Sequence, residues 1–233
     1  MIRFGLPVVL ALALTPALAG PAGAAPPVED SMAQRMLACT GCHDKQGRAA
    51  PDGYYPRIAG KPAGYLYNQL LNFRDGRRNY ALMGKLLAPL SDAYLREIAE
   101  HFATLDLPYP QPPAQRLDAA QAQRGERLAT LGDAQRGIPA CVQCHGAALT
   151  GVAPAVPGLL GLPPDYINAQ LGAWRTGQRA AHTPDCMAQI AQRLAAEDIG
   201  ALAQWLAART VPAQGHPLPT RGAALPLPCG GVP

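Results

Sequence analysis

The sequence predicts an all-α protein built from two copies of one helical unit. Two observations carry this prediction. When the chain of 233 residues is compared with itself at an offset of about 101–104 residues, several blocks recur. Apolar residues also follow helical spacing, as Leu95, Ile98 and Phe102 do in the first copy. Ile199, Leu202 and Leu206 repeat that pattern in the second copy, and no segment alternates as a strand would.

Three blocks of the first copy align with three blocks of the second. The matched segments are 55–60 with 156–161, 65–70 with 166–171, and 73–78 with 174–179. The chain is therefore expected to be a duplicated domain.

Each copy is expected to contain three helices. Residues 31–42 have helical apolar spacing, and residues 64–75 form a second helix that Gly76 ends. The third helix begins near Ser91, a favourable N-cap, and Asp92 suits the positive end of the helix dipole.

Each copy also carries a Cys-x-x-Cys-His motif. The two motifs are Cys39, Cys42 and His43, and Cys141, Cys144 and His145. In this motif two thiols bind a haem covalently and the histidine ligates its iron, so two covalently bound haem c groups are expected. Zinc would need further ligands at short spacing, and a thioredoxin-like pair would need a strand–helix context. Neither context is present in the sequence.

A methionine follows each motif at a matching distance. Met83 lies 40 residues after His43, and Met187 lies 42 residues after His145. A thioether is a soft ligand that raises the reduction potential of haem iron. We expect both methionines in the loop before the last helix of their copy, as the second axial ligands. The histidines outside the motifs are expected to be exposed or locally bonded, and among them His182 is the least unlikely substitute for Met187.

Other repeated residues suit the surroundings of a haem. The carbonyls of Pro56 and Pro157 are expected to accept the Nδ1–H of the ligating histidines. Arg78 and Arg179 could contact haem propionates, or could be solvated surface residues.

The copies differ where Arg57 and Lys61 of the first align with Gly158 and Leu162 of the second. If these cations lie near the first haem, they stabilise its ferrous state. We therefore expect the first haem to have the higher potential.

Cys186 and Cys229 remain once the motifs are counted. A disulfide between them would hold the end of the chain beside Met187. The alternatives are free thiols, or Cys186 as an iron ligand in place of Met187.

The start of the chain has the pattern of a secretory signal, with Arg3, an apolar stretch and small residues near Ala24. Export to the periplasm suits covalent haem attachment, and no other stretch is long enough to span a membrane. The expected segments are the signal 1–24, a first domain 25–107, a Pro-rich linker 108–113, a second domain 114–210 and a Pro/Gly-rich tail 211–233. The net charge of +4 comes without a basic, aromatic-rich run, which argues against nucleic acid binding.

The haem motifs, the paired Tyr-Leu/Ile-x-x-Gln-Leu segments, the Gly-x-Arg turns and the downstream methionines resemble the dihaem cytochrome c4 family. The likeness covers about residues 31–209. It implies tandem class I cytochrome c domains with His43–Met83 and His145–Met187 ligation. It also implies periplasmic electron transfer from a quinol-oxidising complex or dehydrogenase to a terminal oxidase, with membrane association only through such partners. The longer loop before Met187, Cys186 and the tail depart from the pattern.

An electron carrier is thus the leading functional hypothesis. One alternative is a dihaem enzyme, similar to thiosulfate dehydrogenase or a peroxidase, which needs an open or displaceable iron ligand. The other is a permanent electron-transfer subunit of a dehydrogenase.

Overall fold

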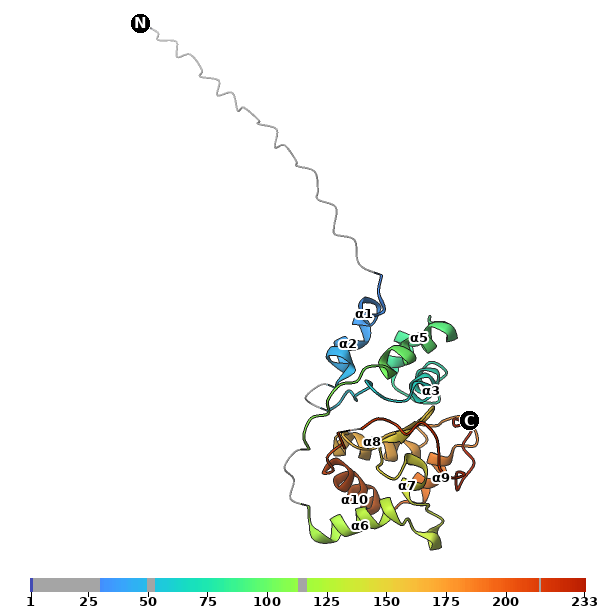
Figure 1. Cartoon of the computed structure of the whole chain (residues 1–233). Helices are drawn as coiled ribbons and strands as arrows, with labels where there is room; N and C mark the ends of the chain where they lie inside the picture. Colours follow the sequence, from blue (N-terminus) through green and yellow to red (C-terminus); the bar gives the residue numbers. More distant parts are fainter. Residues whose placement is uncertain (2–29, 50–52, 113–116, 214) are drawn as a thin grey trace. The chain divides into compact units, whose positions relative to one another are not determined.

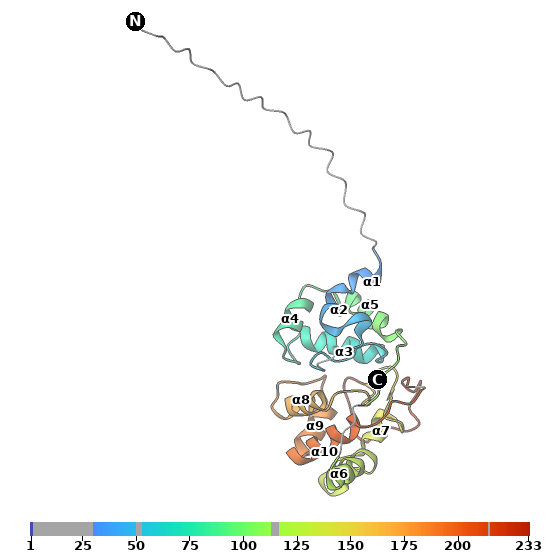
Figure 2. The ribbon, with the colours of Figure 1, turned by 90° about the vertical axis from the view of Figure 1, so that its left-hand side faces the viewer.

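The helices of the two halves of the chain form two groups that meet along one interface (Figures 1 and 2). This computed structural model describes Met1 and residues 30–49, 53–112, 117–213 and 215–233. Apart from Met1, the expected signal segment lies outside the described residues. Residues 31–233 cluster as one unit.

The first repeat (residues 31–107) contains α1 (Met32–Arg35), α2 (Leu37–His43), the short 3-10 helix η1 (Lys45–Gly47), α3 (Ala63–Arg74), α4 (Ala81–Leu87) and α5 (Asp92–Ala103). The second repeat (residues 117–210) contains α6 (Ala119–Thr130), η2 (Ala134–Arg136), α7 (Cys141–His145), α8 (Pro164–Arg175), α9 (Cys186–Arg193) and α10 (Ala196–Ala207). Between α7 and α8, β1 (Gly151–Val152) pairs with β2 (Val156–Pro157) in an antiparallel hairpin. The all-α prediction is confirmed, with this hairpin as the one strand pair in the described part of the chain.

Local chemistry explains where the helices begin and end. The Ser91 hydroxyl accepts a hydrogen bond from the Tyr94 amide at the start of α5, as expected for an N-cap. The Asp185 carboxylate accepts one from Ala188 at the start of α9. Gly76 and Gly177 follow α3 and α8 with φ of +77° and +75°, a left-handed conformation that glycine adopts without steric cost.

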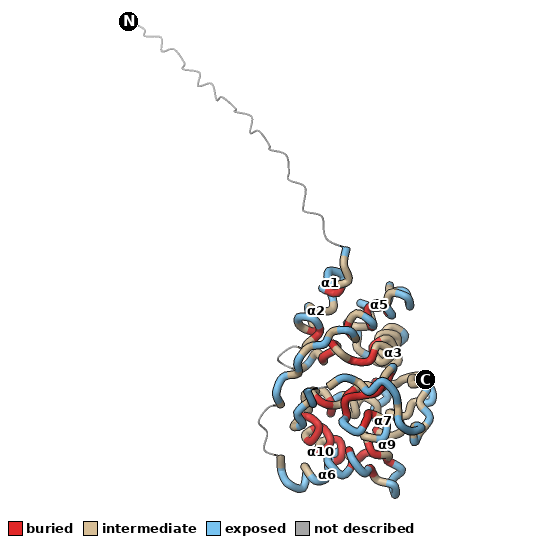
Figure 3. The backbone as a smooth tube through the Cα atoms, in the orientation of Figure 1, coloured by how far each residue is buried: buried red, intermediate tan, exposed pale blue. Residues whose placement is uncertain are grey.

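Each repeat has its own hydrophobic core. In the first, Leu95, Ile98 and Phe102 of α5 are at most 4% exposed and pack against α3. In the second, α10 has more buried residues than any other helix (Figure 3), and it packs against both α6 and α8. The helical spacing recognised in the sequence is therefore the spacing of the buried faces.

The segment that joins the repeats is fixed to the first one. The guanidinium of Arg57 donates to the carbonyls of Ala59, Leu107 and Pro108, and it lies 3.9 Å from the centre of the Tyr109 ring. The first part of the expected linker is thus anchored by a buried arginine. None of the helices in the described ranges is long and apolar enough to cross a membrane.

Close packing of α6 against α10 depends on Gly125. A Cβ atom at this position would lie 2.5 Å from the Ala201 carbonyl oxygen and 2.6 Å from Cβ of Trp205. We expect Gly125→Ala to lower the free energy of unfolding by about 1–3 kcal/mol, because the helices must move apart. Gly200→Ala in α10 is the matched control, since no atom lies within 4 Å of its added Cβ. Denaturant unfolding in which Gly125→Ala is as stable as Gly200→Ala would contradict this packing.

Candidate cofactor sites

Both motif histidines are held in one orientation by a proline carbonyl. His43 ends α2 and His145 ends α7, and both side chains are buried. The Nδ1–H of His43 donates to the Pro56 oxygen at 2.8 Å, and that of His145 to the Pro157 oxygen at 2.7 Å. A carbonyl can only accept, so the proton is on Nδ1 and the lone pair of Nε2 remains free for a metal.

Burial keeps these imidazoles neutral. It lowers the pKa of both His43 and His145, although the bonds to the proline carbonyls act in the opposite direction. The neutral ring is the form that ligates iron.

None of the four motif cysteines forms a disulfide. Burial raises the pKa of Cys39 and Cys144, and it raises the pKa of Cys141 to about 11. A thioredoxin-like pair needs a thiol whose pKa is lowered instead. The shifts at Cys39, Cys141 and Cys144 are thus opposite to those of a thioredoxin-like pair, which favours attachment of a cofactor.

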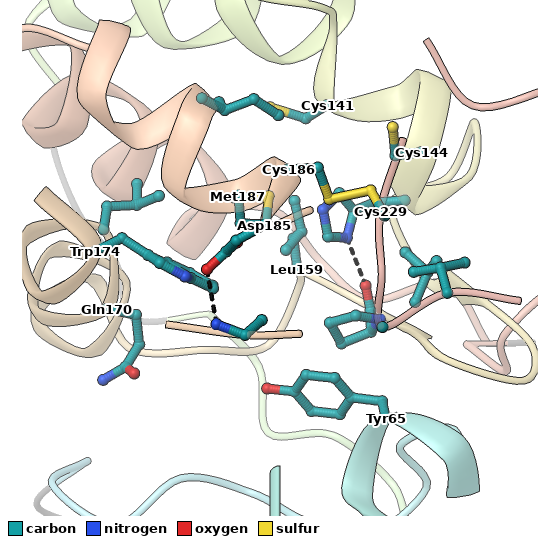
Figure 4. Close-up of a pocket in the computed structure, with 18 of the residues that line it drawn as sticks. Tyr65, Cys141, Cys144, Leu159, Gln170, Trp174, Asp185, Cys186, Met187 and Cys229 are labelled. Carbon is teal, nitrogen blue, oxygen red and sulfur yellow. Dashed lines mark hydrogen bonds between the residues drawn. A yellow bond between two sulfur atoms is a disulfide. The ribbon is translucent and has the colours of Figure 1, made fainter. Parts of the chain in front are cut away.

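A cavity adjoins each motif. The cavity of the first repeat has a volume of about 840 Å³ and is lined by Cys39, Cys42 and Met83. The cavity of the second has about 220 Å³ and is lined by Cys141, Cys144 and Met187 (Figure 4). The cavities thus bring each Cys-x-x-Cys-His motif together with the methionine that the spacing predicts.

The expected loop position of both methionines is wrong. Met83 lies in α4 and Met187 lies in α9. The Asp185 cap starts α9 one residue before Cys186, so the segment forms a helix where the sequence suggested a loop.

Arg78 and Arg179 lie between the repeats rather than on a solvated surface. Arg78 donates to the side-chain oxygens of Gln69 at 3.0 Å and Gln170 at 2.6 Å. Arg179 donates to the same two oxygens, at 3.1 Å and 2.7 Å respectively. Tyr166 also accepts from Arg78. Each glutamine therefore binds both arginines, and the two repeats enter the cluster in equivalent ways.

The backbone repeats this symmetry. Residues 78 and 179 form an antiparallel bridge, in which Asn79 donates to the Gln178 carbonyl and Ala180 donates to the Arg77 carbonyl. Gln69, Tyr166, Gln170 and Arg179 border both cavities. The two candidate sites therefore share a wall. The glutamines were missed in the sequence analysis, although both lie in the repeated Tyr-x-x-x-Gln-Leu segment.

The donors around the cavities suit a group that carries carboxylates. Among the described residues, no carboxylate lies within ion-pair distance of Arg78 or Arg179. Burial lowers the pKa of Arg179 to about 10, with a further contribution from Arg78. The indole N–H of Trp174, which borders the second cavity, is buried without a partner. A porphyrin with propionates would supply apolar surface and the missing acceptors, so these residues fit haem c.

Lys61 is placed differently from the expectation. It is 5% exposed, and its amine donates to the Gly158 carbonyl of the second repeat at 3.3 Å. It borders the second cavity and not the first, while Arg57 borders both. The expectation that Lys61 lies near the first haem is therefore wrong, because packing between the repeats brings its amine to the second repeat.

The tail covers the second cavity. A disulfide joins Cys186 to Cys229, so Cys186 has no thiolate to offer an iron. Leu225 and Leu227 line the cavity, and Leu218 pairs with β1 through backbone hydrogen bonds. In the first repeat, Leu82 occupies the position that aligns with Cys186, directly before the methionine. The Leu82 side chain is 56% exposed.

Two curated relatives span most of the chain. The thiosulfate dehydrogenase electron acceptor of Thiomonas intermedia is 41% identical over 86% of this chain and 90% of its own length. The cytochrome c4 of Pseudomonas aeruginosa is 32% identical over 85% of this chain and 96% of its own length. No family model matches the chain. The chain belongs to the cytochrome c4 family.

Two solved structures have the same fold. Cytochrome c4 of Pseudomonas stutzeri has a TM-score of 0.64 at 30% identity, and the match covers 75% of this chain and 94% of that one. A thiosulfate dehydrogenase structure from Marichromatium purpuratum has a TM-score of 0.65 at 32% identity, and the match covers 76% of this chain but 37% of that one.

Membership of the family establishes the coarse function. The chain is a dihaem c-type cytochrome made of tandem class I domains, with two covalently bound haems. It transfers electrons between redox partners and acts as a carrier rather than an enzyme.

The disulfide should stabilise the second cavity. It closes a loop of 43 residues, for which the chain-entropy model gives about 4 kcal/mol. We expect the double variant Cys186→Ser/Cys229→Ser to lose about that much unfolding free energy in denaturant, and the tail to become sensitive to protease. Wild-type protein treated with a thiol reductant should show the same loss. Equal stability of the oxidised and the reduced protein would refute this role.

Proposed function

We propose that this cytochrome accepts electrons from a thiosulfate dehydrogenase and passes them to a terminal acceptor such as an oxidase. The observation that carries the proposal is the relative of 41% identity, named as the electron acceptor of thiosulfate dehydrogenase. The similarity to part of a thiosulfate dehydrogenase chain supports it. A quinol-oxidising complex is the alternative donor, supported by the general likeness to cytochromes c4.

We further propose His43 with Met83, and His145 with Met187, as the axial ligands of the two irons. The haem supplies a one-electron couple when bound. The chain contributes a histidine held by a proline carbonyl, a thioether that favours the ferrous state, and thiols that anchor the porphyrin. Irons held by both residues would move electrons without binding substrate.

Arg78 and Arg179 are proposed to neutralise haem propionates at the shared wall. A buried guanidinium (Arg179) and a half-buried one (Arg78) without a carboxylate partner are costly, and propionates would offset that cost. The same cluster holds the two sites against each other. By holding the two sites close together, the cluster would support electron transfer between the haems.

We place the working protein in the periplasm, after export by the segment 1–24. The disulfide and the covalent haem attachment both suit an oxidising compartment. The protein would then associate with the membrane only by binding to its partners.

The donor can be tested with purified components. We expect the oxidised cytochrome to be reduced rapidly when thiosulfate and a thiosulfate dehydrogenase from a related bacterium are added together. Neither component alone should reduce it. Reduction by a quinol-oxidising complex, with none by the dehydrogenase, would replace the proposed donor.

The ligands can be tested by single substitutions. Met187→Ala should remove about half of the long-wavelength absorbance band that ferric iron shows with a methionine sulfur, and should let cyanide bind one haem. Met83→Ala should do the same at the other haem. His182→Ala is the control and should leave the band intact. A Met187→Ala protein with the full band would show that another residue ligates the second iron.

A further inference from the structure

Lys61 is a buried cation that has no counterpart in the second repeat. It follows Gly60 in the first repeat, whereas Leu162 occupies the aligned position of the second. Its amine donates a hydrogen bond to the carbonyl of Gly158. Gly158 comes directly after Pro157, whose carbonyl holds His145. Lys61 therefore reaches across the interface to the segment that orients the ligand of the second haem.

The charge of Lys61 is not neutralised by the chain. Among the described residues, no carboxylate lies within ion-pair distance of its amine. The groups that face it are the guanidinium of Arg57, the ring of Tyr109 at 5.9 Å and His145. Burial, with a smaller contribution from Arg57, lowers the pKa of Lys61 to about 8. Most molecules thus keep the cation at pH 7.

The field of this cation extends to the second iron ligand. Lys61 and His145 both line the second cavity, whereas the first cavity is lined by His43 and not by Lys61. Ferric iron carries one more positive charge than ferrous iron. In a buried site, where water screens weakly, a nearby cation therefore disfavours oxidation.

We propose that the positive charge of Lys61, a residue of the first repeat, raises the reduction potential of the haem that the second repeat holds. This inference rests on the proposed ligation by His145 and Met187. It reverses the order expected from the sequence, since Lys61 acts on the second haem and no lysine occupies the equivalent position for the first.

The test is a redox titration at pH 7 of the full holoprotein, monitored by absorbance. Met187→His marks the wave of the second haem, because loss of the thioether lowers its potential. Lys61→Gln removes the charge and keeps a donor for the Gly158 carbonyl, Lys61→Met removes both, and Lys61→Arg keeps the charge. Lys85→Met is the matched control, since it removes an exposed lysine of the first repeat.

We expect Lys61→Gln and Lys61→Met to lower the equilibrium constant for reduction of the second haem about tenfold. Its reduction potential would then fall by about 59 mV. Lys61→Arg and Lys85→Met should leave that wave near its wild-type position. An unmoved second wave in both neutral variants, or a shift of the first wave alone, would overturn the proposal. If the ligation itself is wrong, the band from methionine sulfur to iron is already missing from the wild-type protein, which separates the two failures.

Discussion

The cluster of two arginines and two glutamines at the interface is the contact on which the arrangement of both sites depends. Each glutamine oxygen accepts from Arg78 and from Arg179, so neither repeat can satisfy its own arginine in the same way alone. Gln69, Gln170 and Arg179 border both cavities, and Arg78 borders the first. The contacts that hold the repeats together therefore also hold the two cavities next to each other.

The duplication produces similar sites with different surroundings. In the second repeat, the Cys186–Cys229 disulfide ties the tail over the cavity. In the first, Leu82 at the aligned position remains largely exposed. Lys61 adds a second difference, because its charge lies at the second site alone. Under the role proposed for Lys61, the two haems would have unequal potentials.

Features that depend on local sequence were predictable. The Ser91 cap, the buried face of α5 and the glycine stops after α3 and α8 follow from side-chain chemistry within a few residues. Internal repetition extended the prediction further, because it paired each haem motif with a methionine without any structural information.

Features that depend on packing between the repeats were not predictable. Lys61 is close in sequence to the first site, yet the interface brings its amine to Gly158. Sequence distance alone therefore assigned it to the wrong haem. The positions of Met83 and Met187 within short helices were also missed, because helices of seven and eight residues have little periodic signal. The shared glutamines depend in the same way on contacts between segments about 100 residues apart.

The central claim is that each repeat completes one haem site with its own histidine and methionine. The most direct measurement is the intensity of the band from methionine sulfur to ferric iron, per haem, in the oxidised wild-type protein with and without cyanide. The account predicts two haems per chain, the full intensity of two methionine-ligated irons, and no change when cyanide is added at pH 7 in a short incubation. Half of that intensity, or a fraction of high-spin haem that binds cyanide at once, would contradict it.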